Sequence, residues 1–301
     1  MPFVAPLTHR AAPMVFGAAL LLAAGAAQAQ EAPALSEAAA RGAYIFHAAG
    51  CETCHTDTAN KGAPLAGGRP LKTPFGTFRT PNITPDPTHG IGTWSEADFI
   101  RALREGRSPS GDHYYPAFPY TSYTKMTDAD MKDMRAYIFT LPASSKPNMP
   151  HELGFPFNIR LAVMAWKWLN FMPGPLPATA GKDEAWTRGR YLVEAVAHCA
   201  ECHTPRDRLG GLVTSKWMAG SKDGAEGEAA PNLTPDPATG LGEWSDEDIA
   251  FALKLGMKPD GDSLGSLMAE VIENGTSKLS DADLAAMAAY LKALPPIVHK
   301  P

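Results

Sequence analysis

The sequence predicts an all-α protein made of two similar units in tandem. A five-residue pattern, Cys-x-x-Cys-His, occurs at residues 51–55 and again at residues 199–203. The segments around the two copies also repeat. The repeated segments carry the capping residues that are typical of helices, with glycine-rich and proline-rich stretches between them.

The repeat extends well beyond the cysteine pattern. Asn-Ile-Thr-Pro-Asp-Pro at residues 82–87 returns as Asn-Leu-Thr-Pro-Asp-Pro at residues 232–237, an offset of 150 residues. Gly-x-Trp-Ser at residues 92–95 returns at residues 242–245 with the same offset. Self-similarity over this length indicates two copies of one structural unit.

The first helix of each unit is predicted to deliver the cysteine pattern. In the first unit it runs from Glu37 to Ala49, and Gly42 and Tyr44 within it recur as Gly189 and Tyr191. The stretch that follows the pattern is rich in Gly, Pro and Thr, which favours a wrapped loop rather than a sheet.

Two more helices are predicted per unit. The second opens at Ser95, where Asp98 completes a capping box, and this signature recurs at Ser245 and Asp248. The last helix runs from Thr127 to Leu141, before Pro142, and its copy runs from Ser280 to Leu294, before Pro295.

The Cys-x-x-Cys-His pattern is the attachment site of a c-type haem. Two thiols about one helical turn apart add across the vinyl groups of the porphyrin, and the next residue places its imidazole under the iron. A zinc site would gather four cysteines around one ion, but 144 residues separate the two pairs. We therefore predict two covalent haem c groups, one held by Cys51, Cys54 and His55, the other by Cys199, Cys202 and His203.

The N-terminus indicates export. Arg10 precedes an uncharged run from Ala11 to Ala27, and Ala27-Gln28-Ala29 has small residues at the spacing that signal peptidase requires. We predict a signal peptide at residues 1–29 and a periplasmic protein; a retained membrane anchor is the alternative. Export suits covalent haem, since c-type attachment occurs outside the bacterial cytoplasm.

Composition and charge give no sign of two kinds of partner, nucleic acid and an anionic membrane surface. The chain has 301 residues and a formal net charge of −5. It shows no basic stripe for nucleic acid and no polybasic patch for a membrane surface.

The two units resemble class I c-type cytochrome domains. The Asn-x-Thr-Pro-Asp-Pro segment, Gly-x-Trp-Ser and Tyr-Pro-Ala-Phe-Pro-Tyr at residues 115–120 resemble the cytochrome subunits of periplasmic alcohol, aldehyde and gluconate dehydrogenases. The resemblance implies a carrier of single electrons, with a dehydrogenase as donor and a terminal oxidase or another cytochrome as acceptor. Those subunits commonly carry three haems and a C-terminal membrane-binding segment. This chain has two motifs and ends at Lys300-Pro301, which leaves peripheral membrane association open.

A di-haem redox enzyme, peroxidase-like or thiosulfate dehydrogenase-like, is the alternative function. A catalytic haem needs an open or unusual sixth position, and the two motifs leave no cysteine for thiolate ligation.

The predicted boundaries follow from the repeat. We expect cytochrome c domains at residues 30–143 and 183–301, joined by a linker at residues 144–182. The linker contains a Trp-rich helix over residues 159–171, in which Arg160 and Lys167 make a membrane span implausible. This helix is expected to pack across the junction of the domains; a docking face for a dehydrogenase or an oxidase is the alternative.

The resemblance also implies a sixth iron ligand in each domain, usually methionine. Met268 stands between the wrapped loop and the last helix, where that ligand is expected. Its counterpart lies near residues 115–120, which contain no methionine, so Met126 is the candidate for the first haem. The alternatives are that Met126 only packs against Met131 and that His113 is the ligand.

Several repeated polar groups lie near the wrapped loop. Asn82, Asn232, Trp94 and Trp244 are candidates for hydrogen bonds to haem propionates, with turn formation and core packing as the alternative. Arg79 is a further candidate that has no repeated equivalent.

Overall fold

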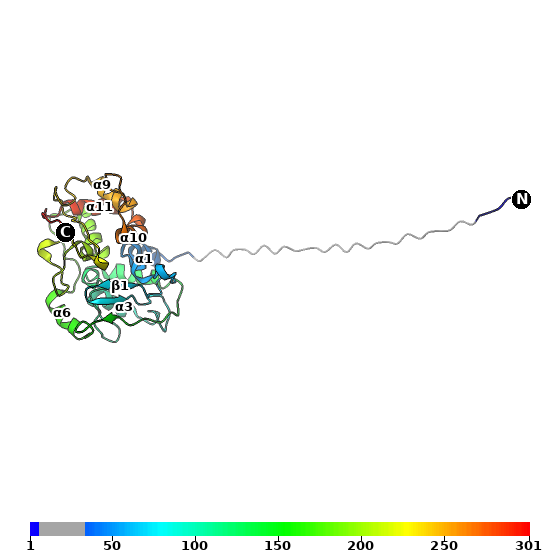
Figure 1. Cartoon of the computed structure of the whole chain (residues 1–301), viewed down its shortest axis with the longest axis horizontal. Helices are drawn as coiled ribbons and strands as arrows, with labels where there is room; N and C mark the ends of the chain where they lie inside the picture. Colours follow the sequence, from blue (N-terminus) through cyan, green and yellow to red (C-terminus); the bar gives the residue numbers. More distant parts are fainter. Residues whose placement is uncertain (6–33) are drawn as a thin grey trace. The chain divides into compact units, whose positions relative to one another are not determined.

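The computed structural model describes residues 1–5 and 34–301 (Figure 1). The predicted signal peptide and its cleavage site fall mainly on residues 6–33, which lie outside the described residues. Residues 35–301 hold both repeated units.

Both units are mainly helical, as predicted. In the first, the helices are α1 (Glu37–Ala48), α2 (Cys51–His55), α3 (Glu96–Glu105), α4 (Tyr120–Tyr123) and α5 (Asp128–Ile138), with the turn η1 (Thr58–Asn60). In the second, they are α7 (Glu184–Tyr191), α8 (Ala200–His203), α9 (Asp246–Leu255), α10 (Ser266–Asn274) and α11 (Asp281–Lys292). The π-helical turn η2 (Leu192–Val196) continues α7, and η3 (Thr214–Lys216), η4 (Ala225–Gly227) and η5 (Thr276–Lys278) are short 3-10 turns.

The first and last helices of each unit cross in backbone contact. A Cβ atom at Gly42 in α1 would lie 1.8 Å from the carbonyl oxygen of Asp133 in α5. A Cβ atom at Gly189 in α7 would lie 1.9 Å from the carbonyl oxygen of Ala286 in α11. Only glycine permits this approach, which explains why it occurs at both positions.

Helix caps follow the predicted pattern. Ser95 and Asp98 form a capping box at the start of α3, and Ser245 and Asp248 form one at the start of α9. Both helices end at a glycine in the left-handed conformation, Gly106 in the first unit and its counterpart in the second. The last helices begin as predicted but end earlier, at Ile138 and Lys292, and single turns continue the chain beyond them.

A small antiparallel sheet corrects the prediction of a wrapped loop without strands. It has the order β1 (Pro70–Thr73), β2 (Gly76–Arg79), β3 (Glu152–Leu153), with Pro70 opposite Arg79 and Gly76 opposite Leu153. The third strand comes from the linker, so this pairing has no local signal in the sequence.

Two tyrosines join the units in a reciprocal arrangement. The Tyr44 hydroxyl donates to Asp283, with 2.6 Å between oxygens, and accepts from the backbone N–H of Ser280 at 3.0 Å. The Tyr191 hydroxyl donates to Asp130 and accepts from the backbone N–H of Thr127 at 3.2 Å. Each tyrosine thus lies at the N-terminus of the other unit's last helix, and burial raises both tyrosine pKa values. The two units are therefore related by an approximate two-fold arrangement at this interface.

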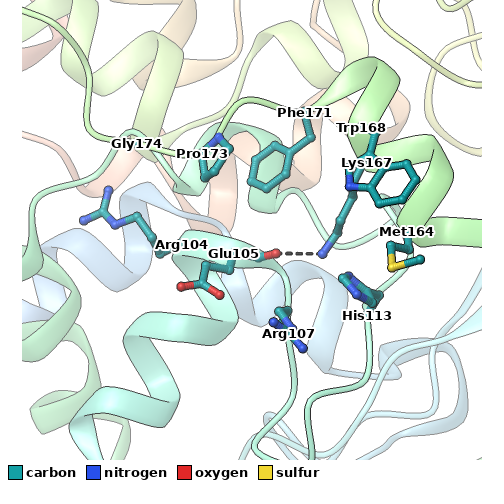
Figure 2. Close-up of a pocket in the computed structure, with 10 residues that line it drawn as sticks. All are labelled: Arg104, Glu105, Arg107, His113, Met164, Lys167, Trp168, Phe171, Pro173 and Gly174. Carbon is teal, nitrogen blue, oxygen red and sulfur yellow. Dashed lines mark hydrogen bonds between the residues drawn. The ribbon is translucent and has the colours of Figure 1, made fainter. Parts of the chain in front are cut away.

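The linker helix α6 (Ala162–Asn170) contacts both units. The buried Lys167 ammonium donates to the carbonyl oxygens of Glu105, at 2.6 Å, and Gly106, at 2.7 Å, where α3 ends (Figure 2). A cation at a helix C-terminus is favourable because the last carbonyls carry partial negative charge. The Trp166 indole N–H donates to the carbonyl oxygen of Leu209 in the second unit at 2.8 Å.

Within the described part of the chain, none of the helices combines the length and the apolar character needed to cross a bilayer.

The helix crossing at Gly42 yields the first prediction. Gly42→Ala forces α1 and α5 apart and should lower the free energy of unfolding of the holoprotein by about 1–3 kcal/mol, a common cost of overpacking. Gly154→Ala is the control, because nothing lies within 4 Å of a Cβ atom there. Denaturant unfolding measures both variants, and equal stability for the two would contradict the crossing.

Candidate haem sites

The two attachment motifs sit on short helices that follow the first helix of each unit. Gly50, with φ 63°, turns the chain from α1 into α2, and His198, with φ 44°, stands at the corresponding turn before Cys199. Each of the four cysteines is unpaired and partly buried. Burial raises the pKa of the Cys51 and Cys199 thiols to about 12, which indicates an apolar environment. Such surroundings suit the edge of a porphyrin.

Both motif histidines have one ring nitrogen fixed by a proline carbonyl. Nδ1 of His55 lies 2.7 Å from the carbonyl oxygen of Pro81, and Nδ1 of His203 lies 2.8 Å from that of Pro231. A carbonyl only accepts, so Nδ1 carries the proton and Nε2 keeps its lone pair for a metal. Burial also lowers the pKa of both histidines, which favours the neutral ligand form. Two thiols and one oriented imidazole per unit are the donor set that a haem c requires.

A glycine in each unit brings the proline carbonyl to the histidine. The N–H of Gly67 donates to the carbonyl oxygen of His55 at 2.8 Å, and that of Gly220 donates to the carbonyl oxygen of His203 at 2.8 Å. A Cβ atom at Gly67 would lie 2.4 Å from the carbonyl carbon of Pro81. Gly67 has φ +67° and Gly220 has φ +87°. The close approach of the backbone and the positive φ both require glycine.

The repeated asparagines hold the turn that follows the proline. The Asn82 side-chain oxygen accepts from the backbone N–H of Thr84 at 2.9 Å, and its amide donates to the carbonyl oxygen of Ser144 at 2.7 Å. Asn232 makes the equivalent bonds to Thr234 and Ile297. In both units the asparagine therefore fixes the turn against the segment after the last helix, which matches the turn alternative rather than propionate binding.

The other candidates for propionate contacts also have roles in packing. Trp94 and Trp244 are partly buried and pack against the hydrophobic core. The Arg79 guanidinium pairs with the Glu152 carboxylate at 2.6 Å, which joins β2 to β3.

The predicted sixth ligands lie in different environments. Met268 is in the first turn of α10, partly buried and packed against the core. Met126 is fully buried just before α5, and Leu279, also buried, holds the same place before α11. His113 lines a cavity of about 440 Å³ with Met164 and Lys167 of α6 (Figure 2). Burial, with Lys167 and Arg107 nearby, lowers the pKa of His113.

Sequence reasoning missed the polar groups that join each motif to the opposite unit. Glu201, inside the second motif, accepts from the Thr121 hydroxyl at 2.6 Å and the Ser122 hydroxyl at 2.7 Å, both in α4 of the first unit. Burial raises the pKa of Glu201, but the Arg206 guanidinium and the two hydroxyls outweigh it and hold that pKa below its usual value. A carboxylate inside the motif is the only sequence signal, because its partners are distant in the chain.

Arg69 makes the reciprocal contact. Its guanidinium donates to the carbonyl oxygen of Thr53, inside the first motif, at 2.8 Å. The same group pairs with Glu226, at 3.1 Å, and with Glu270 in α10 of the second unit. The two attachment helices therefore lie along the same interface.

Comparison with known proteins follows the same division into two units. The cytochrome c family model matches twice, at residues 39–142 and at residues 187–295. Each match contains one complete attachment motif. The chain therefore carries two haem c groups, one in each unit.

The chain is similar to several curated proteins. A diheme cytochrome c-type protein of Cereibacter sphaeroides is 47% identical, over 87% of this chain and 88% of that protein. The fructose dehydrogenase cytochrome subunit of Gluconobacter japonicus is 41% identical, over 85% of this chain and 52% of the subunit. The cytochrome c subunit of a quinone alcohol dehydrogenase of Gluconacetobacter polyoxogenes is 39% identical, over 93% of this chain and 61% of the subunit. The chain thus spans between half and two thirds of these two dehydrogenase subunits.

The contact at Gly67 yields a prediction on the first haem. Gly67→Ala should push the Pro81 carbonyl away from Nδ1 of His55, weaken the imidazole as a ligand and raise the reduction potential of that haem. Spectroelectrochemical titration resolves the two haems. Gly227→Ala is the matched control, since that residue also has a positive φ, +82°, but nothing within 4 Å of a Cβ atom. Identical potentials in the two variants would show that the close approach has no role.

Proposed function

Because the chain belongs to the cytochrome c family, we propose that it is an exported di-haem electron carrier that links a dehydrogenase to a terminal oxidase or another cytochrome. The observation that carries this proposal is the contact of both attachment helices with one interface. When bound, each haem c supplies an iron that gains or loses one electron. The residues of the chain hold the two groups in a fixed relation to each other.

Contacts between the units keep the two attachment sites close. Cys202 lies near enough to Cys54 to contribute to the raised pKa of the Cys54 thiol, after the larger effect of burial. Helix α10, which carries Met268, also contacts α2, the attachment helix of the first haem. An electron that enters at one haem therefore has a short path to the other through packed protein.

Two features support export to the periplasm. Residues 1–29 have the charge, apolar run and small-residue site of a secretory leader. Covalent attachment of haem through Cys-x-x-Cys-His takes place outside the bacterial cytoplasm. The proposal includes removal of the leader and a periplasmic location.

Met268 is our proposal for the sixth ligand of the second haem. It lies between the wrapped loop and the last helix, partly buried and beside the core of its domain. A thioether in that position favours Fe(II) and raises the reduction potential, which suits a carrier.

The exposed face of α6 is the surface we propose for the dehydrogenase. Four apolar residues are exposed on and beside this helix: Leu161 at 69%, Trp168 at 78%, Leu169 at 75% and Met172 at 88%. The opposite face of α6 binds both domains through Trp166 and Lys167, so a protein seated on α6 lies beside both haem-bearing domains. The similarity to dehydrogenase cytochrome subunits supports a dehydrogenase as the partner at this surface. Exposed apolar groups of this size are typical of interaction sites.

The carrier role is tested by oxygen uptake. A strain that lacks this chain should lose oxygen uptake driven by one substrate from a panel of alcohols, aldehydes, fructose and gluconate, and the intact gene should restore it. The variant with Cys51→Ser and Cys54→Ser should fail to restore uptake, because it cannot hold the first haem. Unchanged uptake on every substrate in the deletion strain would reject this dehydrogenase-linked role.

The docking face is tested with surface variants. Trp168→Ser combined with Leu169→Ser should raise the KM of the dehydrogenase for this cytochrome about tenfold, which corresponds to about 1.4 kcal/mol of binding. The control is Phe251→Ser combined with Leu255→Ser on α9, where both side chains are also exposed. Equal KM values for the two double variants would place the dehydrogenase elsewhere.

A further inference from the structure

The backbones of the two domains correspond residue by residue up to Tyr114 and Leu264, just before the expected ligand position. The N–H of Tyr114 donates to the carbonyl oxygen of Gly106, and the N–H of Leu264 donates to that of Gly256. The backbone of Arg107 pairs with that of His113 as a single antiparallel β-bridge, and the backbone of Met257 pairs with that of Ser263 in the same way. All these pairs keep the offset of 150 residues. Four residues after Tyr114 and Leu264, the same offset pairs Phe118 of the first domain with Met268 of the second.

Phe118 lies in an aromatic group beside the first attachment motif. Its ring centroid is 5.7 Å from that of Tyr114 and 5.7 Å from that of Tyr123. The Tyr123 hydroxyl donates to the carbonyl oxygen of Ala49, two residues before Cys51, at 2.8 Å. A phenyl ring has no lone pair to give to iron, so Phe118, which the offset of 150 residues pairs with Met268, cannot supply the ligand atom that a methionine would.

Neither alternative donor occupies that position. Met126 corresponds to Leu279: the N–H of Met126 donates to the carbonyl oxygen of Tyr123, and the N–H of Leu279 donates to that of Thr276. Because the second domain has leucine at this place, we infer that the side chain of Met126 serves in packing. His113 corresponds to Ser263 and lines the cavity beside α6.

We propose that His55 is the one protein ligand that the first domain offers to its haem iron, and that this iron, with Phe118 beside it, would bind a small neutral diatomic molecule such as carbon monoxide or nitric oxide. The surroundings of Phe118 favour neutral ligands, because the rings of Tyr114 and Tyr123 lie against Phe118. Burial also raises the pKa of the Tyr114 hydroxyl to about 12, so that this group carries no charge. This goes beyond electron transfer, since a carrier needs no open coordination position. The earlier prediction that Met126 ligates this iron competes with the proposal.

Carbon monoxide binding to the reduced holoprotein tests the proposal. The wild-type protein should bind one molecule per two haems, measured by absorption titration. Phe118→Met places a thioether at the Met268 position and should abolish this binding, add a second iron–sulfur charge-transfer band and raise the potential of the first haem. Met268→Ala should instead increase the stoichiometry to two.

Two further variants separate ligation from packing. Met126→Leu should leave the stoichiometry at one, since leucine is the natural residue at position 279. Phe118→Leu, which adds no ligand, should also leave it at one. The proposal is overturned if the wild-type protein binds no carbon monoxide, or if binding first appears in the Met126→Leu variant. It is also overturned if the Phe118→Met variant still binds one molecule of carbon monoxide per two haems. These results do not depend on whether a dehydrogenase is the electron donor.

Discussion

The backbone contact between the first and last helices of each domain organises the rest of the structure. Gly42 and Gly189 allow α1 to lie on α5 and α7 to lie on α11. The attachment motif follows the first helix, and the segment with the expected sixth ligand precedes the last one. Fixing the crossing therefore fixes the positions of the attachment motif and of the segment that is expected to carry the sixth ligand. The loop between them has to close only the remaining side, where Gly67 and Gly220 bring a proline carbonyl to the motif histidine.

Polar contacts also tie the two domains to each other. Glu201 ties the second motif to α4, and Arg69 ties the first motif to Glu226 and Glu270. Partly buried ionic groups of this kind contribute modestly to stability, but their pairing requires the two domains to keep this arrangement. A fixed geometry between two redox centres matters for a carrier, because the transfer rate depends steeply on the separation of the centres.

The features predicted from the sequence are those with local or periodic signals. The attachment motifs, the capping box at Ser95 and the duplication were all visible, and they yielded the two tandem helical domains. Features that depend on distant partners were not. Strand β3 pairs with β2 across more than 70 residues, Lys167 finds its carbonyl partners at the end of α3, and the interface role of Arg69 has no pattern around it. The asparagines of the repeated turn were visible, but only the structure shows that they bind the chain after the last helix.

The reciprocal contacts of Tyr44 and Tyr191 have the form of an isologous interface, in which the same patch on two copies binds itself. In a homodimer every substitution appears on both sides of such an interface. Fusion of the two copies into one chain removes that constraint, because each half then mutates alone. The fused protein keeps the geometry of a symmetric dimer while its two cofactor environments are free to diverge. The difference between Phe118 and Met268 is a divergence that no symmetric assembly of one gene product can have.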